Sequence, residues 1–109
     1  MFSRDAEADR AFLSDVLGFE SVDAGHGWLI FALPPAEAAV HPADGDPAYA
    51  LYLMSDDLPA DIAALTAKGV VCSDVQEERW GSVTGFRLPG GADLGLYQPR
   101  HPSPLRGNP

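Results

Sequence analysis

The sequence predicts an α+β fold built from two tandem βαβββ modules within one domain. Three observations support this prediction. The 109 residues suit one compact domain and are too few for two ordinary ones. The second half repeats the pattern of the first, because residues 5–19 align with residues 56–70. Hydrophobic residues make up 46% of the chain and charged residues 21%, which is typical of a globular protein and not of a disordered one.

The repeated segments predict two equivalent amphipathic helices. Each begins at an aspartate suited to cap a helix, Asp5 in the first and Asp56 or Asp57 in the second. Each ends at a glycine suited to the left-handed conformation that follows many helices, Gly18 or Gly69. The apolar residues along them are Phe12, Leu13, Val16 and Leu17 in the first helix and Leu58, Ile62 and Leu65 in the second.

Strands follow each helix in the same order. FALPPAEAAVHP at 31–42 and FRLPGGADLGLYQP at 86–99 both predict a strand, a proline-containing turn and a last strand. Gly90 and Gly91 follow Pro89 between two strands, so we expect a hairpin turn there and not a phosphate cradle. The other predicted strands lie near residues 19–24, 27–33, 70–75 and 82–88.

The two modules differ in the strand that precedes the helix. Residues 49–55 are rich in strand formers and long enough for a central strand. Only residues 1–4 precede the first helix, so we expect the first module to lack most of its leading strand, with a native start upstream of Met1 as the alternative. The backbone groups that this strand would pair stay open and favour association. We therefore expect a homodimer whose partner covers the gap.

The repeat also sets the expected domain boundaries. A single domain spans residues 1–100, with module one at 1–43 and module two at 48–100. Residues 101–109 are rich in proline, and we expect a flexible tail there.

The charge excludes two classes of partner. Sixteen acidic residues against seven Lys and Arg leave a formal net charge of −9. This charge repels phosphate backbones and anionic lipids, so we expect neither a nucleic acid nor a membrane as partner. The sequence has no apolar run of membrane-spanning length and no leader, and the single Cys72 cannot form an internal disulfide. We expect a soluble cytoplasmic protein.

Two motifs carry a family resemblance: DxxxxxxFLxDVLGF in the first module and LPGGxxLGLYxP in the second. With the two βαβββ copies, they resemble the vicinal oxygen chelate superfamily, which includes glyoxalase I, bleomycin resistance proteins and extradiol dioxygenases. The resemblance covers about residues 2–100. It implies that the curved sheets of the two modules enclose a cleft. It also implies that the enzymes hold a divalent metal there, by side chains from the first and last strand of each module.

The resemblance assigns four metal-ligand positions to this sequence. His41, at the end of the last strand of module one, offers an imidazole, which suits a transition metal. Gln98 takes the matching position in module two, where relatives carry Glu, and offers only a neutral oxygen. Ala50 cannot ligate, and the fourth position would precede Met1. Catalytic sites need about three protein ligands. We therefore expect no cofactor, with Ni, Zn, Fe or Mn on His41 and Gln98 as the alternative.

Side-chain alternation selects candidates for the cleft. Ala50, Tyr52 and Met54 share one face of their strand, and the resemblance assigns that face to the cleft. Leu94, Leu96 and Gln98 also share a face, and Gln98 would pair with His41 at the cleft floor if both point inward. Packing in the core is the alternative for each apolar residue. The expected cleft residues are His41, Tyr49, Tyr52, Met54, Trp80 and Gln98.

Two functions follow, and we assign no catalytic residue. The first is a glyoxalase or bleomycin-resistance-like protein that binds a small molecule between the modules without a complete metal site. The charge of −9 would favour a cationic ligand. The alternative is a divalent-metal-dependent lyase, isomerase or dioxygenase acting on vicinal oxygens, with His41 and Gln98 as ligands completed by water, Tyr49 or a partner subunit. A fold retained only for assembly is a third reading.

Overall fold

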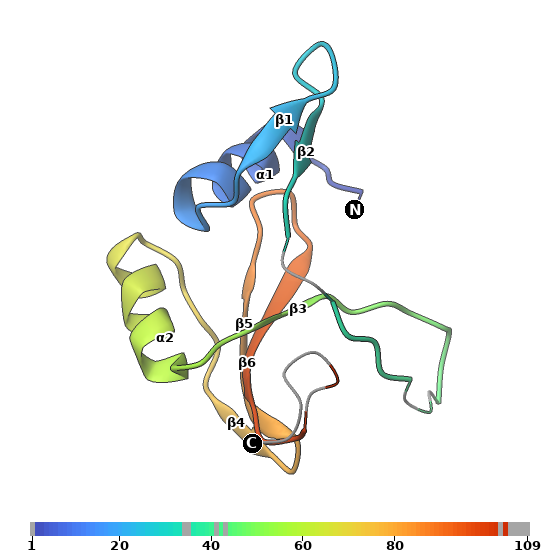
Figure 1. Cartoon of the computed structure of the whole chain (residues 1–109), viewed down its shortest axis with the longest axis vertical. Helices are drawn as coiled ribbons and strands as arrows, with labels where there is room; N and C mark the ends of the chain where they lie inside the picture. The colour runs from blue at the N-terminus through green and yellow to red at the C-terminus, as the bar shows by residue number, and fades with distance from the viewer. Residues whose placement is uncertain (1, 34–35, 41, 43, 103, 105–109) are drawn as a thin grey trace.

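The computed structural model describes residues 2–33, 36–40, 42, 44–102 and 104. Figure 1 shows a mixed arrangement of helices and strands, which confirms the predicted α+β class. The strands form a two-stranded sheet, β1-β2, and a four-stranded sheet of order β3-β6-β5-β4. In chain order the elements are α1 (Ala6–Ala11), the π-helical turn η1 (Phe12–Val16), β1 (Ser21–Asp23), β2 (Leu29–Phe31), β3 (Tyr52–Met54), α2 (Leu58–Ala67), β4 (Gln76–Glu78), β5 (Gly81–Arg87) and β6 (Asp93–Pro99).

The first predicted helix is present as α1 continued by η1. Asp5 caps it, because its Oδ1 accepts a hydrogen bond from the backbone N–H of Ala8 at 3.1 Å. The helical segment ends before Gly18, which has a φ of 75°. Both ends therefore lie where the sequence predicted them.

The second helix confirms the predicted end and decides which of the two candidate aspartates is the cap. Gly69, with a φ of 86°, follows its last turn. The cap is Asp57 and not Asp56, since Oδ1 of Asp57 accepts from the N–H of Ala60 at 3.2 Å. An aspartate cap bonds the N–H two or three residues ahead. The third residue after Asp56 is Pro59, which has no N–H, and this explains the shift by one residue.

The four-stranded sheet contains the complete βαβββ order of the second module. β5 and β6 form an antiparallel hairpin from Gly81 opposite Pro99 to Arg87 opposite Asp93. β3 runs parallel to β6, and β4 runs antiparallel to β5. The predicted central strand at 49–55 is wrong in this respect, because β3 is short and lies at an edge of the sheet. The hairpin takes the two middle places and leaves β3 and β4 outside.

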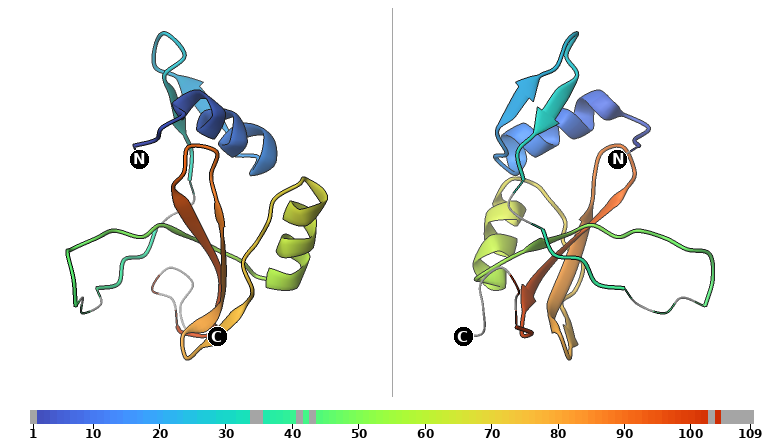
Figure 2. Two further views of the ribbon diagram at one scale, coloured as in Figure 1. Left: turned by 180° about the vertical axis from the view of Figure 1, so that it is seen from behind. Right: turned by 45° about the vertical axis from the view of Figure 1, so that its right-hand side comes forward.

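One face of this sheet packs against α2 and forms the core (Figure 2). η1 of the first module joins the same core, with the rings of Phe12 and Phe86 5.9 Å apart. The predicted apolar stripes therefore point inward, except for Leu13 of the first helix. The buried cluster consists of Leu58, Leu65, Val70, Phe86, Leu88, Leu94 and Leu96.

The described residues of the first half form fewer strands than predicted. β1 and β2 are shorter than the expected 19–24 and 27–33, and they pair through the turn at Gly25, His26 and Gly27. The predicted last strand of this module is absent from its described residues, 36–40 and 42. Figure 1 shows 36–40 running away from both sheets. His41 lies outside the described residues.

The predicted turn at Gly90 is confirmed, and it joins the two halves of the chain. The N–H of Gly90 donates to Oδ1 of buried Asp9 at 2.7 Å, and its carbonyl accepts from the N–H of Arg4 at 3.3 Å. A Cβ at Gly90 would lie 1.8 Å from Oγ of Ser3 and 2.6 Å from Oδ2 of Asp9, so a side chain here would require these two residues to move. Neither helix in the described part of the chain is long and apolar enough to cross a membrane.

Candidate functional site

The sheet face opposite α2 is the candidate site. Side chains alternate along a strand, so Leu94 and Leu96 of β6 point into the core while Gly95 and Tyr97 point the other way. β3 matches this pattern, since Tyr52 lies beside Gly95. We call this surface the open face; it carries Tyr52, Met54, Val83, Gly85, Gly95 and Tyr97.

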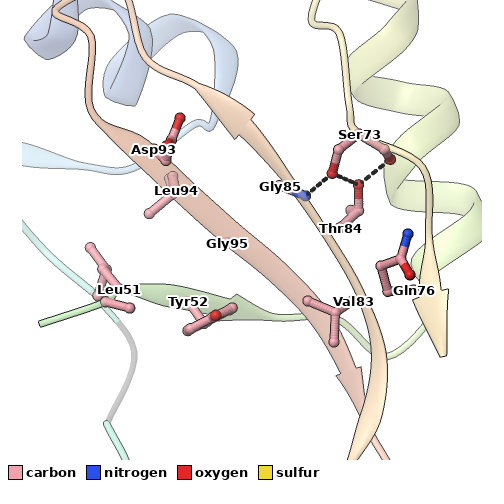
Figure 3. A pocket seen from close by; sticks show the side chains of 11 residues that line it. Leu51, Tyr52, Ser73, Gln76, Val83, Thr84, Gly85, Asp93, Leu94 and Gly95 are labelled. Atoms are coloured by element: carbon pink, nitrogen blue, oxygen red, sulfur yellow. Dashed lines mark hydrogen bonds between the residues drawn. The ribbon is translucent and has the colours of Figure 1, made fainter. Parts of the chain in front are cut away.

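A solvent-open pocket of about 260 Å³ lies on the open face (Figure 3). β3, β5, β6 and the segment leading into β4 all contribute to it. Most of the exposed lining is apolar, with a few polar groups at the rim, which is the usual make-up of a small-molecule site. The residues that shape it include Leu51, Tyr52, Ser73, Gln76, Val83 and Asp93.

Two facing glycines form the floor of this pocket. Gly85 of β5 pairs directly with Gly95 of β6. The ring of Tyr52 lies on Gly95, because a Cβ added there would be 2.1 Å from Cδ1 of Tyr52. The three atoms nearest to a Cβ added at Gly85 would all belong to the backbone, the closest being the oxygen of Leu94 at 3.1 Å. The floor is therefore covered at Gly95 and bare at Gly85.

Hydrogen bonds of Ser73 and Thr84 stabilise the side of the pocket next to Gly85. The backbone N–H of Gly85 donates to Oγ of Ser73 at 3.1 Å, and the N–H of Ser73 donates to the carbonyl of Gly85 at 2.9 Å. The hydroxyl of Thr84 donates to the carbonyl of Ser73 at 2.6 Å. These bonds satisfy the polar groups of the wall. The exposed amide of Gln76 lies at the rim, where it is available to a ligand (Figure 3).

Three rings form an aromatic cluster beside the pocket: Tyr52, Trp80 and Tyr97. They meet edge to face, with centroids 6.0 Å apart for Tyr52 and Trp80, 5.8 Å for Tyr52 and Tyr97, and 5.3 Å for Trp80 and Tyr97. Tyr97 is buried, and its hydroxyl lies 3.1 Å from Nε2 of His101. His101, which the sequence analysis placed in the tail, therefore packs against the domain.

The structure brings together some of the predicted cleft residues. Tyr52 and Trp80 are in contact, and Met54 lies on the open face beside Tyr97. Tyr49 precedes β3 and is fully exposed.

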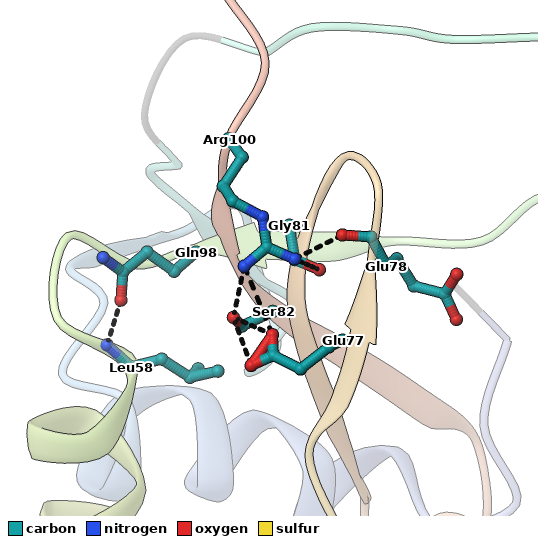
Figure 4. A network of polar contacts seen from close by, with 7 residues as sticks. All are labelled: Leu58, Glu77, Glu78, Gly81, Ser82, Gln98 and Arg100. Carbon is teal, nitrogen blue, oxygen red and sulfur yellow. Dashed lines mark hydrogen bonds and ion pairs between the residues drawn. The ribbon is translucent and has the colours of Figure 1, made fainter.

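Gln98 lies on the opposite side of the sheet from Tyr52. Its Oε1 accepts a hydrogen bond from the backbone N–H of Leu58 at 2.9 Å, at the first turn of α2 (Figure 4). This placement follows from the alternation, because residues 94, 96 and 98 share one face and the first two are core leucines. Gln98 therefore does not lie with Tyr52 and Met54, although the sequence analysis grouped them.

The metal-ligating side chains in the described part of the chain do not form a catalytic metal site. No three His, Cys, Asp or Glu side chains gather there in a group that could hold an ion. The oxygen of Gln98 already accepts from Leu58, and His41 is not described. A catalytic metal needs about three protein ligands. We derive no chemical step through a metal.

Hydrogen bonds from Arg100 stabilise the loop that carries Trp80 (Figure 4). Its guanidinium donates to Oε2 of Glu77 at 3.2 Å and to Oγ of Ser82 at 3.2 Å, and it also donates to the backbone carbonyls of Glu78 and Gly81. The hydrogen bond from Ser82, followed by that from Arg100, lowers the pKa of Glu77.

The sequence analysis missed the glycine floor, although a signal for it was present. A hairpin turn at Gly90 pairs residues symmetrically about that position, which sets Gly85 opposite Gly95. The same register leaves Arg87 beside Asp93, and these two form an exposed ion pair at 3.2 Å.

Solved structures match this fold over most of the chain. TnmS3, an antibiotic binding protein from Streptomyces sp. CB03234, is 30% identical over 87% of each chain, with a TM-score of 0.67. A glyoxalase/bleomycin resistance protein from the same strain is 30% identical over 86% of this chain and 91% of that one, with a TM-score of 0.60. A lactoylglutathione lyase from Agrobacterium tumefaciens shares the fold at 18% identity over 90% and 88%, with a TM-score of 0.63. No protein-family model and no curated protein sequence matches the chain.

Proposed function

Because this chain belongs to the glyoxalase/bleomycin resistance protein/dioxygenase superfamily, we propose that it binds a small organic molecule of the antibiotic type and releases it unchanged. The pocket on the open face, with the aromatic cluster beside it, carries this proposal. The 30% identity to an antibiotic binding protein over 87% of the chain supports it.

The chemistry of the pocket suits binding by contact. Leu51, Val83 and the ring of Tyr52 supply apolar surface, and Gln76 supplies a hydrogen-bonding amide. The net charge of −9 favours a ligand that carries a positive charge. None of these interactions requires a metal ion. Metal-dependent catalysis on a substrate with vicinal oxygens is the alternative that the experiment below separates.

We also propose that the chain acts as a homodimer. β1 and β2 form a two-stranded sheet that is separate from the four-stranded one, and a two-stranded sheet by itself is marginally stable in water. The cross-strand pair Val22 and Ile30 is largely exposed on this sheet, and Trp28 nearby is exposed to a similar degree. A second copy that covers this surface would bury apolar groups that one chain leaves in water.

Trp80 provides the readout for the test of binding. The sequence contains two tryptophans, so a Trp28→Phe variant leaves Trp80 as the single reporter, with its ring 6.0 Å from that of Tyr52. This variant would be treated with a chelator and titrated with bleomycin and a panel of aromatic antibiotics. We expect saturable quenching with at least one antibiotic, and mass spectrometry should recover that antibiotic unchanged.

Two outcomes would contradict the proposal. If no antibiotic in the panel quenches Trp80, the chain is not an antibiotic-binding protein of this kind. If the ligand is altered, or binds only after Ni, Zn, Fe or Mn is restored, the chain is a metal-dependent enzyme. A Trp28→Phe, Trp80→Phe double variant controls for quenching that does not arise at the pocket.

A further inference from the structure

We propose that the pocket selects molecules with a flat ring system, which lie on the bare backbone of Gly85 with one edge against Tyr52. This inference rests on the proposed function, because it names the class of ligand for that same pocket.

The facing pair of glycines is the first reason. Glycine within a strand weakens a sheet, because it has no side chain to pack and loses more conformational freedom on folding. Here two of them, Gly85 and Gly95, stand opposite each other in the middle of the β5–β6 hairpin. An interior glycine in a strand often marks a place where another group approaches the backbone closely.

Tyr52 shows how an aromatic ring packs on the backbone of a glycine in this sheet. The ring of Tyr52 lies directly on Gly95, where a Cβ would collide with three of its atoms at 2.1, 2.4 and 2.9 Å. The neighbouring Gly85 presents the same kind of surface with no ring on it. A second flat ring, supplied by a ligand, would extend the same packing by one strand.

The surrounding side chains limit the area of exposed backbone at Gly85. Val83 and Arg87 lie two residues before and after Gly85 on the same face of β5, and Arg87 is held by its ion pair with Asp93. Tyr52 bounds the floor on the β6 side, and Ser73 bounds it on the other side (Figure 3). The surface left uncovered is the backbone of Gly85 with the peptide planes on either side of it. This area suits a flat system of two or three fused rings.

A flat ring gains more from this floor than a puckered one. All atoms of a flat ring reach contact distance of the peptide planes together, whereas a saturated ring touches them with only some of its atoms. Shape therefore separates the two classes even when charge and composition are alike.

The experiment compares two amines that share one carbon skeleton and one charge. The probes are naphthalen-2-ylmethanamine and its decahydro analogue, titrated into the full chain by calorimetry. We expect the flat amine to bind at least about tenfold more tightly. In ¹⁵N–¹H spectra the flat amine should shift the amide signals of Gly85 and Gly95. The amide signal of Gly69, which follows the C-terminal end of α2, should stay unchanged.

A variant pair provides the second arm. Gly85→Val fills the floor with a residue that strands favour, while Gly45→Val makes the same change in open space outside the sheets. Binding of the flat amine should fall at least about tenfold in the first and stay unchanged in the second. The amide shifts of the wild-type chain provide the test if Gly85→Val does not fold.

The inference is overturned if both amines bind equally or not at all, if the shifts lie away from Gly85, or if a folded Gly85→Val binds like the wild type. These results would not refute the proposed function, because antibiotic binding is tested separately by the titration of Trp80 fluorescence. Antibiotic binding without a preference for the flat amine would refute this inference alone.

Discussion

At the scale of single residues, the alternation of side chains in β6 decides which groups serve the core and which face the pocket. Gly95 and Tyr97 lie on the open face, and Leu94 and Leu96 lie in the core. Gln98 follows the leucines and accepts from the N–H of Leu58, one of the donors that the first turn of a helix leaves unpaired. Its amide oxygen therefore helps to hold α2 on the sheet.

This role predicts the effect of replacing Gln98. Gln98→Ala leaves the N–H of Leu58 without its acceptor, and Leu58 is 2% exposed. We expect the free energy of unfolding to fall by about 1–3 kcal/mol in urea. Gln98→Glu keeps an acceptor and adds a negative charge at the helix N-terminus, so its stability should be close to that of the wild type.

Antibiotic affinity should be unchanged in a folded Gln98→Ala variant, because residue 98 lies across the sheet from Tyr52. A loss of affinity at unchanged stability would show that Gln98 serves the ligand site and not α2.

At the scale of elements, a polar network fixes the β4–β5 loop and with it Trp80. Glu77 of β4 accepts from Ser82 of β5 at 2.6 Å and from Arg100 at 3.2 Å. Both bonds favour the ionised carboxylate, so the pKa of Glu77 is lowered in the folded chain. A lowered pKa adds stability at pH values above the unfolded pKa, and this contribution is lost as the pH falls through the folded pKa.

Removal of the stronger bond gives the element-scale prediction. Ser82→Ala should raise the pKa of Glu77 toward its ordinary value, as measured by NMR titration of the carboxyl carbon. Arg100→Ala should raise it as well, because the hydrogen bond and the positive charge of Arg100 both favour the ionised carboxylate. Ser21→Ala, on exposed β1, is the matched control and should leave it unchanged. An unchanged pKa of Glu77 in Ser82→Ala would contradict the network.

At the scale of the whole molecule, the unusual feature is how much apolar surface one chain exposes. Val22 and Trp28 are each 67% exposed and Ile30 is 57% exposed. Within the described residues, the outer edge of β3 pairs with no other strand. An open edge and an apolar sheet face both favour association. The proposed homodimer accounts for both features.

Sedimentation velocity over a range of micromolar concentrations tests the dimer. We expect the wild type to sediment at twice the chain mass of 11.6 kDa. Ile30→Lys should shift it toward the monomer, because a charge would be buried in the interface. Val71→Lys makes a similar change at another exposed site and should leave the dimer intact. A wild-type monomer at every concentration would refute the proposal.

The sequence by itself determined the local features: the ends of the helical segments at Gly18 and Gly69, the cap at Asp5, the turn at Gly90, and the α+β class. These depend on contacts between residues close in the chain, which the order of residue types specifies directly. The superfamily could also be recognised from the two motifs.

Only the tertiary structure decided the features that depend on distant partners. It placed β3 at an edge, turned Gln98 toward α2, and brought Trp80 against Tyr52. Alternation separates the two faces of a strand but does not say which face a helix will cover. That choice depends on where α2 packs, and it is the reason that the glycine floor lies in the candidate site while Gln98 bonds the first turn of α2.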